Sequence, residues 1–112
     1  MKKIRTGRTT FHAKGVRVSL KEGRREVAHA YLYIMRNDLH DEPFGLVEDV
    51  FVEETRRGMG HGTRLLKKLV KEARKEGCYK IVATSRRARK AVHRWYKKLG
   101  FKDYGVEFRL DL

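Results

Sequence analysis

Apolar and polar residues alternate in three stretches of the chain, and this alternation predicts β-strands. The first two, Val16 to Leu20 and Val27 to Met35, are separated by a polar turn that contains Gly23, which predicts an antiparallel hairpin. The third, Gly45 to Val52, follows the polar and acidic loop Arg36 to Pro43. Both faces of the second stretch carry apolar or aromatic residues, so we expect both of its faces to be covered.

Two further stretches have the spacing of an amphipathic helix. Their apolar positions are Leu65, Leu66, Leu69, Val70 and Ala73 in the first, and Ala88, Ala91, Val92, Trp95 and Leu99 in the second. We expect the first helix to end at Gly77. The second should begin at Ser85 or Arg86 and end at Gly100, because glycine commonly follows the last helical turn. Between the helices, Tyr79 to Thr84 predicts a strand that is a parallel neighbour of the third alternating strand.

The two ends of the chain carry weaker patterns. Met1 to His12 is basic with isolated apolar residues, and we expect a short strand or a loosely held arm there. Phe101 to Leu112 alternates again, which predicts a last strand or strand pair. Together these elements predict one domain, residues 1 to 112, of the α/β (α+β) class, with a mixed sheet of about six to seven strands and two main helices.

Three glycines at alternate positions, Gly58, Gly60 and Gly62, stand between the third strand and the first helix. Backbone N–H groups without neighbouring side chains are free to face an anion, and the start of the helix adds positive potential. The spacing fits neither a P-loop, which needs Lys and then Ser or Thr after its last glycine, nor the dinucleotide-binding fingerprint. We interpret this loop as a phosphate-binding cradle. The alternative is a flexible turn that caps the helix.

Two adjacent carboxylates, Glu48 and Asp49, lie in the middle of an otherwise apolar strand. Strand interiors are depleted in such residues, and burying a carboxylate is costly unless it is paired. Strict alternation would place Glu48 on the same side as Val50 and Val52. The carboxylates therefore indicate either a functional role or an ion pair with a neighbouring Arg or Lys at a strand edge.

The chain is basic, with 28 Lys and Arg against 14 Asp and Glu and a net charge of +14. The excess lies in the second half, since there are 11 basic and 9 acidic residues up to Arg56 but 17 and 5 from Arg57 on. Such a field attracts polyanions, such as nucleic acid, an acidic protein or the phosphates of a small molecule. Alternatively, the 38% of charged residues is typical of a thermophilic composition, in which charges form surface ion pairs.

Composition also argues against several classes of protein. No apolar run approaches the length of a membrane span, and Met1 to Lys3 leads into polar sequence without a signal-peptide pattern. The single cysteine, Cys78, cannot form an internal disulfide, and the histidines do not have metal-ligand spacing. We therefore expect a cytoplasmic protein with no membrane partner and no metal.

Two motifs carry a family resemblance. Arg57 to Gly62 reads Arg-x-x-Gly-x-Gly, and Trp95 to Phe101 reads aromatic, Tyr, three residues, Gly-Phe. The first resembles the acetyl-CoA pyrophosphate loop of the GNAT N-acetyltransferase superfamily, and the second resembles another of its signatures. Val47 to Val52 and Gly77 to Ile81 are similar to segments of the eukaryotic glucosamine 6-phosphate N-acetyltransferases. The resemblance implies a compact GNAT-like fold and direct transfer of an acetyl group from the CoA thioester to a primary amine.

The resemblance also implies roles for individual residues. Tyr96 would protonate the CoA thiolate, because a phenol keeps its proton at neutral pH; the alternative is a core aromatic residue. Glu48 or Asp49 would remove the amine proton. Glu48 is favoured because strict alternation places it on the same face as Val50 and Val52 at the end of the strand. The glycine loop would bind the pyrophosphate, and the end of the strand would pair with the pantetheine arm. The expected contacts with acetyl-CoA are Val50, Phe51, Val52, Arg57, Gly58, Met59, Gly60, His61, Gly62, Thr63 and Lys98.

In one respect the chain departs from the superfamily. GNAT enzymes usually carry two helices between their first two strands, and Met1 to Val16 leaves no room for them. Those helices help form the acceptor pocket, so the identity of the acceptor stays open between a phosphorylated amino sugar and a protein amine. The second subunit of a homodimer could complete the site. The alternative function is a non-catalytic nucleic-acid-binding module that uses the basic second helix. The presence of both the loop and Tyr96 disfavours it.

Overall fold

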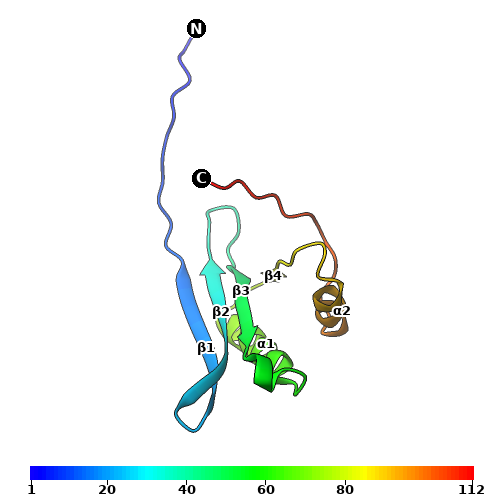
Figure 1. Ribbon diagram of the computed structural model, residues 1–112. Coiled ribbons are helices and arrows are strands. Elements are labelled where there is room, and N and C mark those ends of the chain that lie inside the picture. Colours follow the sequence, from blue (N-terminus) through cyan, green and yellow to red (C-terminus); the bar gives the residue numbers. More distant parts are fainter.

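The computed structural model describes residues 1–112 and contains one four-stranded sheet and two α-helices (Figure 1). The elements in chain order are β1 (Lys14–Glu22), β2 (Arg25–Met35), β3 (Phe44–Val52), the 3-10 helix η1 (Glu54–Arg56), α1 (His61–Lys75), β4 (Ile81–Ala83) and α2 (Lys90–Lys98). The strands lie in the order β1-β2-β3-β4, with β1, β2 and β3 antiparallel and β4 parallel to β3. The predicted hairpin, the strand, loop and helix order and the parallel neighbour are confirmed.

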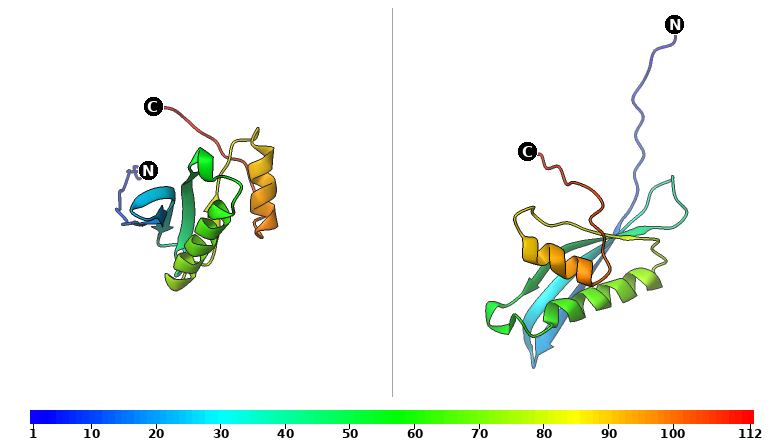
Figure 2. Two further views of the ribbon diagram at one scale, coloured as in Figure 1. Left: turned by 60° about the horizontal axis from the view of Figure 1, so that its bottom comes forward. Right: turned by 90° about the vertical axis from the view of Figure 1, so that its right-hand side faces the viewer.

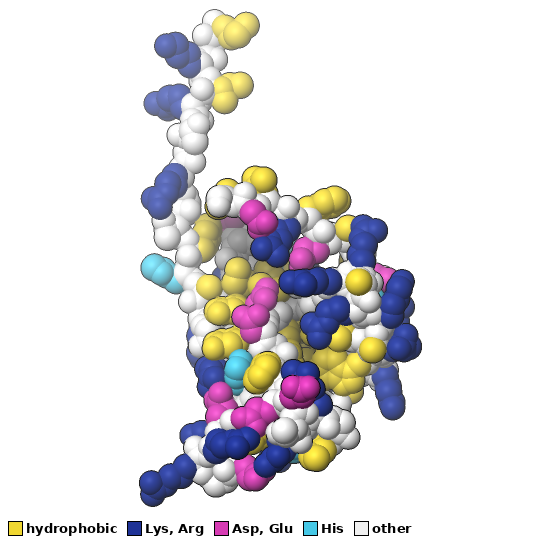
Figure 3. All heavy atoms as spheres, viewed as in Figure 1, with side chains coloured by type: hydrophobic (Ala, Val, Ile, Leu, Met, Phe, Trp, Pro, Cys, Tyr) yellow, Lys and Arg dark blue, Asp and Glu magenta, His cyan; other side chains and the backbone are white.

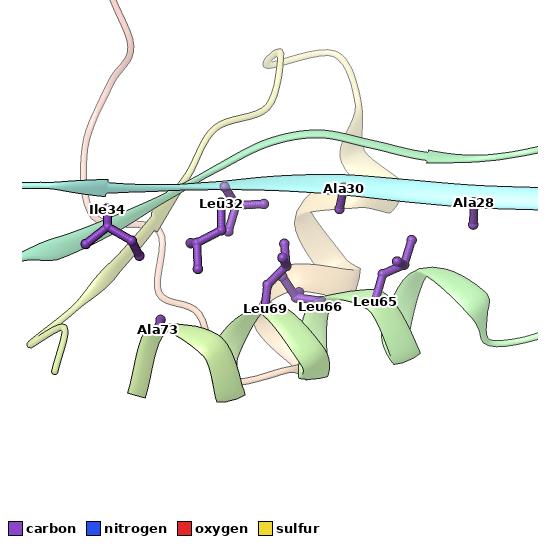
Figure 4. Packing of buried hydrophobic residues seen from close by; sticks show 9 residues of the cluster. Ala28, Ala30, Leu32, Ile34, Leu65, Leu66, Leu69 and Ala73 are labelled. Atoms are coloured by element: carbon purple, nitrogen blue, oxygen red, sulfur yellow. The ribbon is translucent and has the colours of Figure 1, made fainter. Parts of the chain in front are cut away.

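Helix α1 covers one face of the sheet and forms the core with it. Alternate side chains of β2 point toward α1, and the apolar side chains of α1 point back toward them (Figure 4). The buried residues of this cluster are Ala28, Ala30, Leu32, Ile34, Val47, Leu65, Leu66, Leu69 and Ala73. Because α1 begins directly after the glycine loop, this packing also fixes the loop relative to the sheet.

Replacing Leu69 by alanine is expected to lower the free energy of unfolding by about 2–5 kcal/mol. The Leu69 side chain is fully buried, at 0% exposure, between α1 and β2, so its truncation leaves a cavity that the neighbours fill only in part. Chemical denaturation measures the loss. The exposed neighbour Lys67 supplies the control, since Lys67→Ala should change stability by less than about 0.5 kcal/mol. An equal loss in both variants would contradict this description of the core.

A β-bulge in β3 is the feature of the fold that most affects the site. His29 pairs with Phe51 and Tyr31 pairs with Glu48, so β3 has one more residue than β2 over this interval. Asp49, inside the interval, has a left-handed backbone with φ of 50°, which is uncommon for a residue other than glycine. A bulge of this kind bends its strand and reverses the alternation of side chains beyond it.

The bulge decides which face carries each side chain of β3. Val52 pairs with Ala28 on the face covered by α1, whereas Glu48 and Phe51 pair with residues of the opposite face. The prediction that Glu48 shares a face with Val50 and Val52 is therefore wrong. Strict alternation fails because one extra residue lies between the two halves of the strand.

No helix covers the opposite face of the sheet. In the view of Figure 1, α1 lies behind the sheet and α2 lies beside it, so β1, β2 and β3 are open toward the viewer. Tyr33 and Phe51 on this face are 38% and 45% exposed. The prediction that both faces of the second strand are covered is wrong, because an apolar or aromatic pattern shows which residues share a face and not what packs against it.

The sheet has four strands and not the predicted six to seven. Met1 to Ala13 and Phe101 to Leu112 have no regular secondary structure. Of the two alternatives for the N-terminal residues, a short strand or an arm, the structure shows the arm. Tyr104 and Phe108 are 95% and 92% exposed. A strand needs a hydrogen-bonded partner as well as an alternating pattern, and the C-terminal residues extend away from the sheet (Figure 1).

Helix α2 begins at Lys90, later than the predicted Ser85 or Arg86. The Arg86 carbonyl accepts a hydrogen bond from the Arg89 N–H at 3.1 Å, and the Nε2 atom of His93 lies 2.8 Å from the same carbonyl. The carbonyl that would start an earlier helix is therefore engaged in a turn.

Neither α1 nor α2 combines the length and the apolar character that crossing a membrane requires.

Candidate active site

The glycine loop presents a run of unpaired backbone donors. Gly58 and Gly60 have left-handed backbones, with φ of 78° and 82°, a conformation that glycine adopts without a steric cost. The Arg64 N–H donates to the Gly60 carbonyl at 3.0 Å, and none of the six N–H groups from Gly58 to Thr63 donates to another part of the chain. Unpaired N–H groups at the start of a helix form a site for an anion.

Helix α2 is held against the first turn of α1, beside the loop (Figure 2). The Trp95 indole Nε1 donates to the Thr63 hydroxyl at 2.9 Å. A Cβ atom on Gly62 would lie 3.5 Å from the Trp95 ring and 3.9 Å from the Val52 side chain, which leaves little room for a longer side chain. Gly62 and the Thr63 hydroxyl therefore serve the packing of α2, and only their backbone N–H groups stay available to a ligand.

Strands β3 and β4 separate next to the bulge. They pair only from Gly45 with Ile81 to Val47 with Ala83, whereas β3 continues to Val52. The part of β3 that contains the bulge therefore has no strand partner on the side of β4, and its open edge leads toward the glycine loop. An open strand edge of this kind can bind an extended ligand through backbone hydrogen bonds.

Arg57 connects the loop to the end of β3. Its Nε atom donates to the Val52 carbonyl at 2.9 Å, and its guanidinium carbon lies 6.0 Å from the centre of the Phe51 ring. No carboxylate pairs with Arg57, so its charge contributes to the potential at the loop. The side chains of Met59 and His61 make no hydrogen bond, which agrees with a contribution from their backbone alone.

Tyr96 lies partly buried on α2, with its ring 4.9 Å from the Trp95 ring and 5.2 Å from the Phe101 ring between centroids. Burial raises the pKa of Tyr96, the charge of Arg89 lowers it and the charge of Glu48 raises it. Glu48 and Tyr96, which lie on different elements, are therefore within electrostatic reach of each other. Tyr96 keeps its proton to a higher pH than a free phenol, as a proton donor requires.

The two strand carboxylates are free of ion pairs. Neither Glu48 nor Asp49 takes part in any salt bridge of the structure, which removes the ion-pair explanation for their position. Glu48 is partly buried and Asp49 is exposed at the bulge. Both remain available to a ligand on the open face of the sheet.

Lys98 lies apart from the rest of the expected site. It is exposed in the last turn of α2, and the next residue, Leu99, lines a groove with Leu66 and Val70 from the middle of α1. The C-terminal end of α2 therefore faces the middle of α1, whereas the loop precedes its first turn. Contact of Lys98 with a CoA phosphate stays a prediction.

Sequence reasoning missed a group of side chains on the open face. The Nδ1 atom of His29 lies 3.3 Å from Oε2 of Glu26, and Glu26 accepts two hydrogen bonds from the Arg17 guanidinium at 2.5 and 2.7 Å. The His29 ring stacks on Phe51, with centroids 5.3 Å apart. The sequence shows that His29 is on a strand, but the bulge that brings Phe51 opposite it has no sequence signal that we can identify.

The ion pair between Arg17 and Glu26 should be visible in the pH dependence of stability. The hydrogen bonds from Arg17 lower the pKa of Glu26 from 4.5 to about 2. Because the pKa is lower in the folded protein, this carboxylate contributes stability above about pH 4.5, and the contribution is lost as the pH falls toward about 2. We expect Glu26→Gln to have a shallower fall in Tm over this range than the wild type.

Circular dichroism melts between these pH values measure that slope. Glu107→Gln, which removes an exposed carboxylate without an ion pair, is the control and should keep the slope of the wild type. Identical slopes for all three proteins would contradict the assignment.

The structure contains no group of three or more His, Cys, Asp and Glu side chains that could hold a metal ion.

Residues 6–101, which make up most of the chain, match the acetyltransferase (GNAT) family. The chain belongs to this family. Over 68 residues it is 40% identical to the glucosamine 6-phosphate N-acetyltransferase of Trypanosoma brucei brucei, a match of 61% of this chain and 44% of that relative. Over 66 residues it is 38% identical to glucosamine 6-phosphate N-acetyltransferase 1 of Oryza sativa subsp. japonica, a match of 59% of this chain and 38% of that relative. This GNAT chain therefore spans less than half the length of these curated relatives.

Solved structures agree with the GNAT fold. An acetyltransferase from Trypanosoma brucei matches this chain with a TM-score of 0.79 at 33% identity, covering 88% of this chain and 69% of that one. The glucosamine-6-phosphate N-acetyltransferase of Arabidopsis thaliana matches with a TM-score of 0.77 at 22% identity, covering 87% and 66%, a level of identity that shows the fold alone. The GNAT-like α/β fold with a mixed sheet and two helices is confirmed.

Proposed function

We propose that this GNAT protein is an acetyl-CoA-dependent N-acetyltransferase that moves an acetyl group to a primary amine. The observation that carries the proposal is the run of unpaired N–H groups from Gly58 to Thr63 at the start of α1, next to the open edge of β3. The family and the names of the curated relatives favour the same reaction.

The residues of the loop suit the pyrophosphate of acetyl-CoA. A pyrophosphate carries its charge on oxygen atoms that accept hydrogen bonds, and the loop offers backbone donors together with the Arg57 charge. A Cβ atom added at Gly58 or Gly60 would meet nothing within 4 Å, so the protein leaves space above the loop. The open edge of β3 from Val50 to Val52 would bind the pantetheine arm, with the Val52 N–H directed to the thioester carbonyl.

Glu48 would accept the proton that the amine loses. A primary amine is mostly an ammonium ion at neutral pH and has no lone pair to attack a thioester until it gives up a proton. Glu48 is a free carboxylate on the open face, and it lies within electrostatic reach of Tyr96. Asp49, which is more exposed, is the second candidate.

Tyr96 would donate a proton to the sulfur of CoA as the bond between carbon and sulfur breaks. The acetyl group is supplied by acetyl-CoA as a thioester, and the new amide bond forms to the amine nitrogen. The ammonium nitrogen loses two protons on its way to an amide. One passes through Glu48 and solvent and restores the proton that Tyr96 gave to sulfur, and the other leaves to solvent, so that both groups end the reaction in their starting states. Burial between Trp95 and Phe101 keeps the Tyr96 hydroxyl protonated before the reaction.

The acceptor is a phosphorylated amino sugar, as the names of the curated relatives suggest, or a protein amine. A homodimer formed through the sheet edge, in which a second subunit completes the acceptor site, is part of the proposal. No feature of the site favours a nucleic-acid-binding module.

Release of free thiol from acetyl-CoA in the presence of primary amines tests the proposal. We expect thiol to appear in step with the acetylated amine identified by mass spectrometry. The same amines already acetylated at nitrogen are the control and should release no thiol above background. If none of a broad set of free amines gives more thiol than this control, the proposed activity is wrong.

A further inference from the structure

The open face of the sheet carries two carboxylates that form no ion pair, in a chain that is basic as a whole. The chain carries a net charge of +14. In Figure 3, Lys and Arg gather over α2, basic and acidic side chains are mixed around the tip of the β1–β2 hairpin, and acidic, histidine and apolar side chains lie over the strands. Arg17 on this face is neutralised by Glu26. Glu48 and Asp49 on the same face have no ion-pair partner.

An aromatic row lies across the same face. Phe51 stacks on His29 at 5.3 Å, His29 meets Tyr31 edge to face at 5.8 Å, and Tyr31 stacks with Tyr33 at 6.4 Å between ring centroids. An open hollow of about 450 Å³ lies over one end of this row, lined by His29, Tyr31, Asp49, Val50 and Phe51. The faces of aromatic rings attract cations, and a carboxylate beside them adds a charged partner.

No lysine or arginine lines this hollow. Two arginines lie near its rings but outside its lining, and only the charge of Arg17 is offset by an ion pair. Arg17, 5.6 Å from the centre of the Tyr31 ring, is bonded to Glu26, and Arg57, 6.0 Å from the Phe51 ring, donates to the Val52 carbonyl. A phosphorylated acceptor would place two negative charges beside Asp49, and only Arg57, outside the lining, is near enough to offset part of them.

We propose that this hollow binds the acceptor as an aliphatic primary ammonium, with the cation over His29, Tyr31 and Phe51 and beside Asp49, and that it discriminates against phosphorylated amino sugars. The inference rests on the proposed acetyltransferase function, because it places the acceptor at the bulge of β3. There the bound ammonium lies on the same face as Glu48, the residue proposed to take its proton. The ammonium can belong to a free diamine or to a lysine side chain, since both present the same group on an alkyl chain.

The test compares four probes with the full chain: cadaverine, a short neutral lysine peptide, glucosamine and glucosamine 6-phosphate. Binding of each is measured by calorimetry, with and without CoA, and turnover is measured as thiol release. We expect cadaverine or the lysine peptide to bind at least about tenfold more tightly than glucosamine 6-phosphate. The Asp49 carboxylate attracts the ammonium of the first two probes and repels the phosphate of the third. Tighter binding of cadaverine than of the peptide identifies a small-molecule source, and the reverse identifies a protein.

Asp49→Asn tests the role of the carboxylate. Asparagine tolerates the left-handed backbone of Asp49, so the variant should fold, and we expect its Kd for the preferred ammonium to rise by about threefold to tenfold with an unchanged Kd for acetyl-CoA. Asp103→Asn, on the exposed C-terminal segment, changes the net charge equally and should leave both constants unchanged.

Equal or tighter binding of glucosamine 6-phosphate, or no binding of either aliphatic probe at millimolar concentration, would overturn the inference. An equal effect of the two asparagine variants would also overturn it. Failure of the proposed function has a different signature, namely no binding of acetyl-CoA and no thiol release with any of the four probes, and the binding of the ammonium probes without CoA can still be measured in that case.

Discussion

Replacing Tyr96 by phenylalanine should lower kcat by about 10²- to 10⁴-fold, the range found when a general acid is removed. The substitution keeps the ring that packs between Trp95 and Phe101 and removes only the hydroxyl that would give a proton to the CoA sulfur. Acetyl-CoA binding should change little, because the proposed binding groups are backbone N–H groups on another element. Steady-state kinetics and calorimetry on the same preparation measure the two effects.

The pH dependence of the wild type adds a second measurement at Tyr96. Burial raises the pKa of its hydroxyl, so the acid form persists above the ordinary value and kcat should not fall through loss of this proton until strongly alkaline pH. Tyr104→Phe, in the exposed C-terminal segment, is the matched control and should retain wild-type kcat. If Tyr96→Phe loses acetyl-CoA binding and turnover to the same degree, Tyr96 has a structural role and the assignment is wrong.

Replacing Gly60 by valine should abolish detectable binding of acetyl-CoA. The Gly60 backbone has φ of 82°, which a β-branched residue adopts only with strain, so the loop is expected to change conformation and its N–H groups to lose their common direction. The added side chain would also extend into the space that the structure leaves open above the loop. Calorimetric titration with acetyl-CoA measures the loss.

Gly77→Val is the matched control for the backbone strain. Gly77 follows the other end of α1, has φ of 77° and likewise has no heavy atom within 4 Å of an added Cβ. Both variants should therefore lose a similar amount of stability, but only Gly60→Val should lose acetyl-CoA binding. Retained binding in Gly60→Val, or equal loss in both variants, would show that the loop is not the binding site.

Local patterns predicted most of the ordered part of the fold. The alternation of β1 and β2 and the helical spacing of Leu65, Leu66 and Leu69 were sufficient because each pattern has one face that α1 or the sheet buries. The C-terminal residues have an equally regular alternation, with Tyr104 and Phe108 on one side, and form no strand. Whether an alternating segment pairs depends on a neighbouring edge, which its own residues do not specify.

The candidate site was predicted where it depends on local backbone and missed where it depends on register. Three closely spaced glycines before an apolar helix were enough to predict unpaired N–H groups at Gly58 and Gly60. The wrong face for Glu48 and the unrecognised contact of His29 with Phe51 have one cause, the extra residue of β3 at the bulge. A bulge shifts side chains by pairing with another strand, and the residues of one strand alone do not reveal it.

Calorimetric titration of the wild-type protein with acetyl-CoA is the most direct test of the central claim that the loop from Arg57 to Thr63 holds the acetyl donor. We predict saturable binding of one acetyl-CoA per chain with a micromolar Kd. Absence of binding at millimolar acetyl-CoA, in a preparation whose thermal unfolding is cooperative, would contradict the claim and leave the unpaired N–H groups of the loop without a ligand.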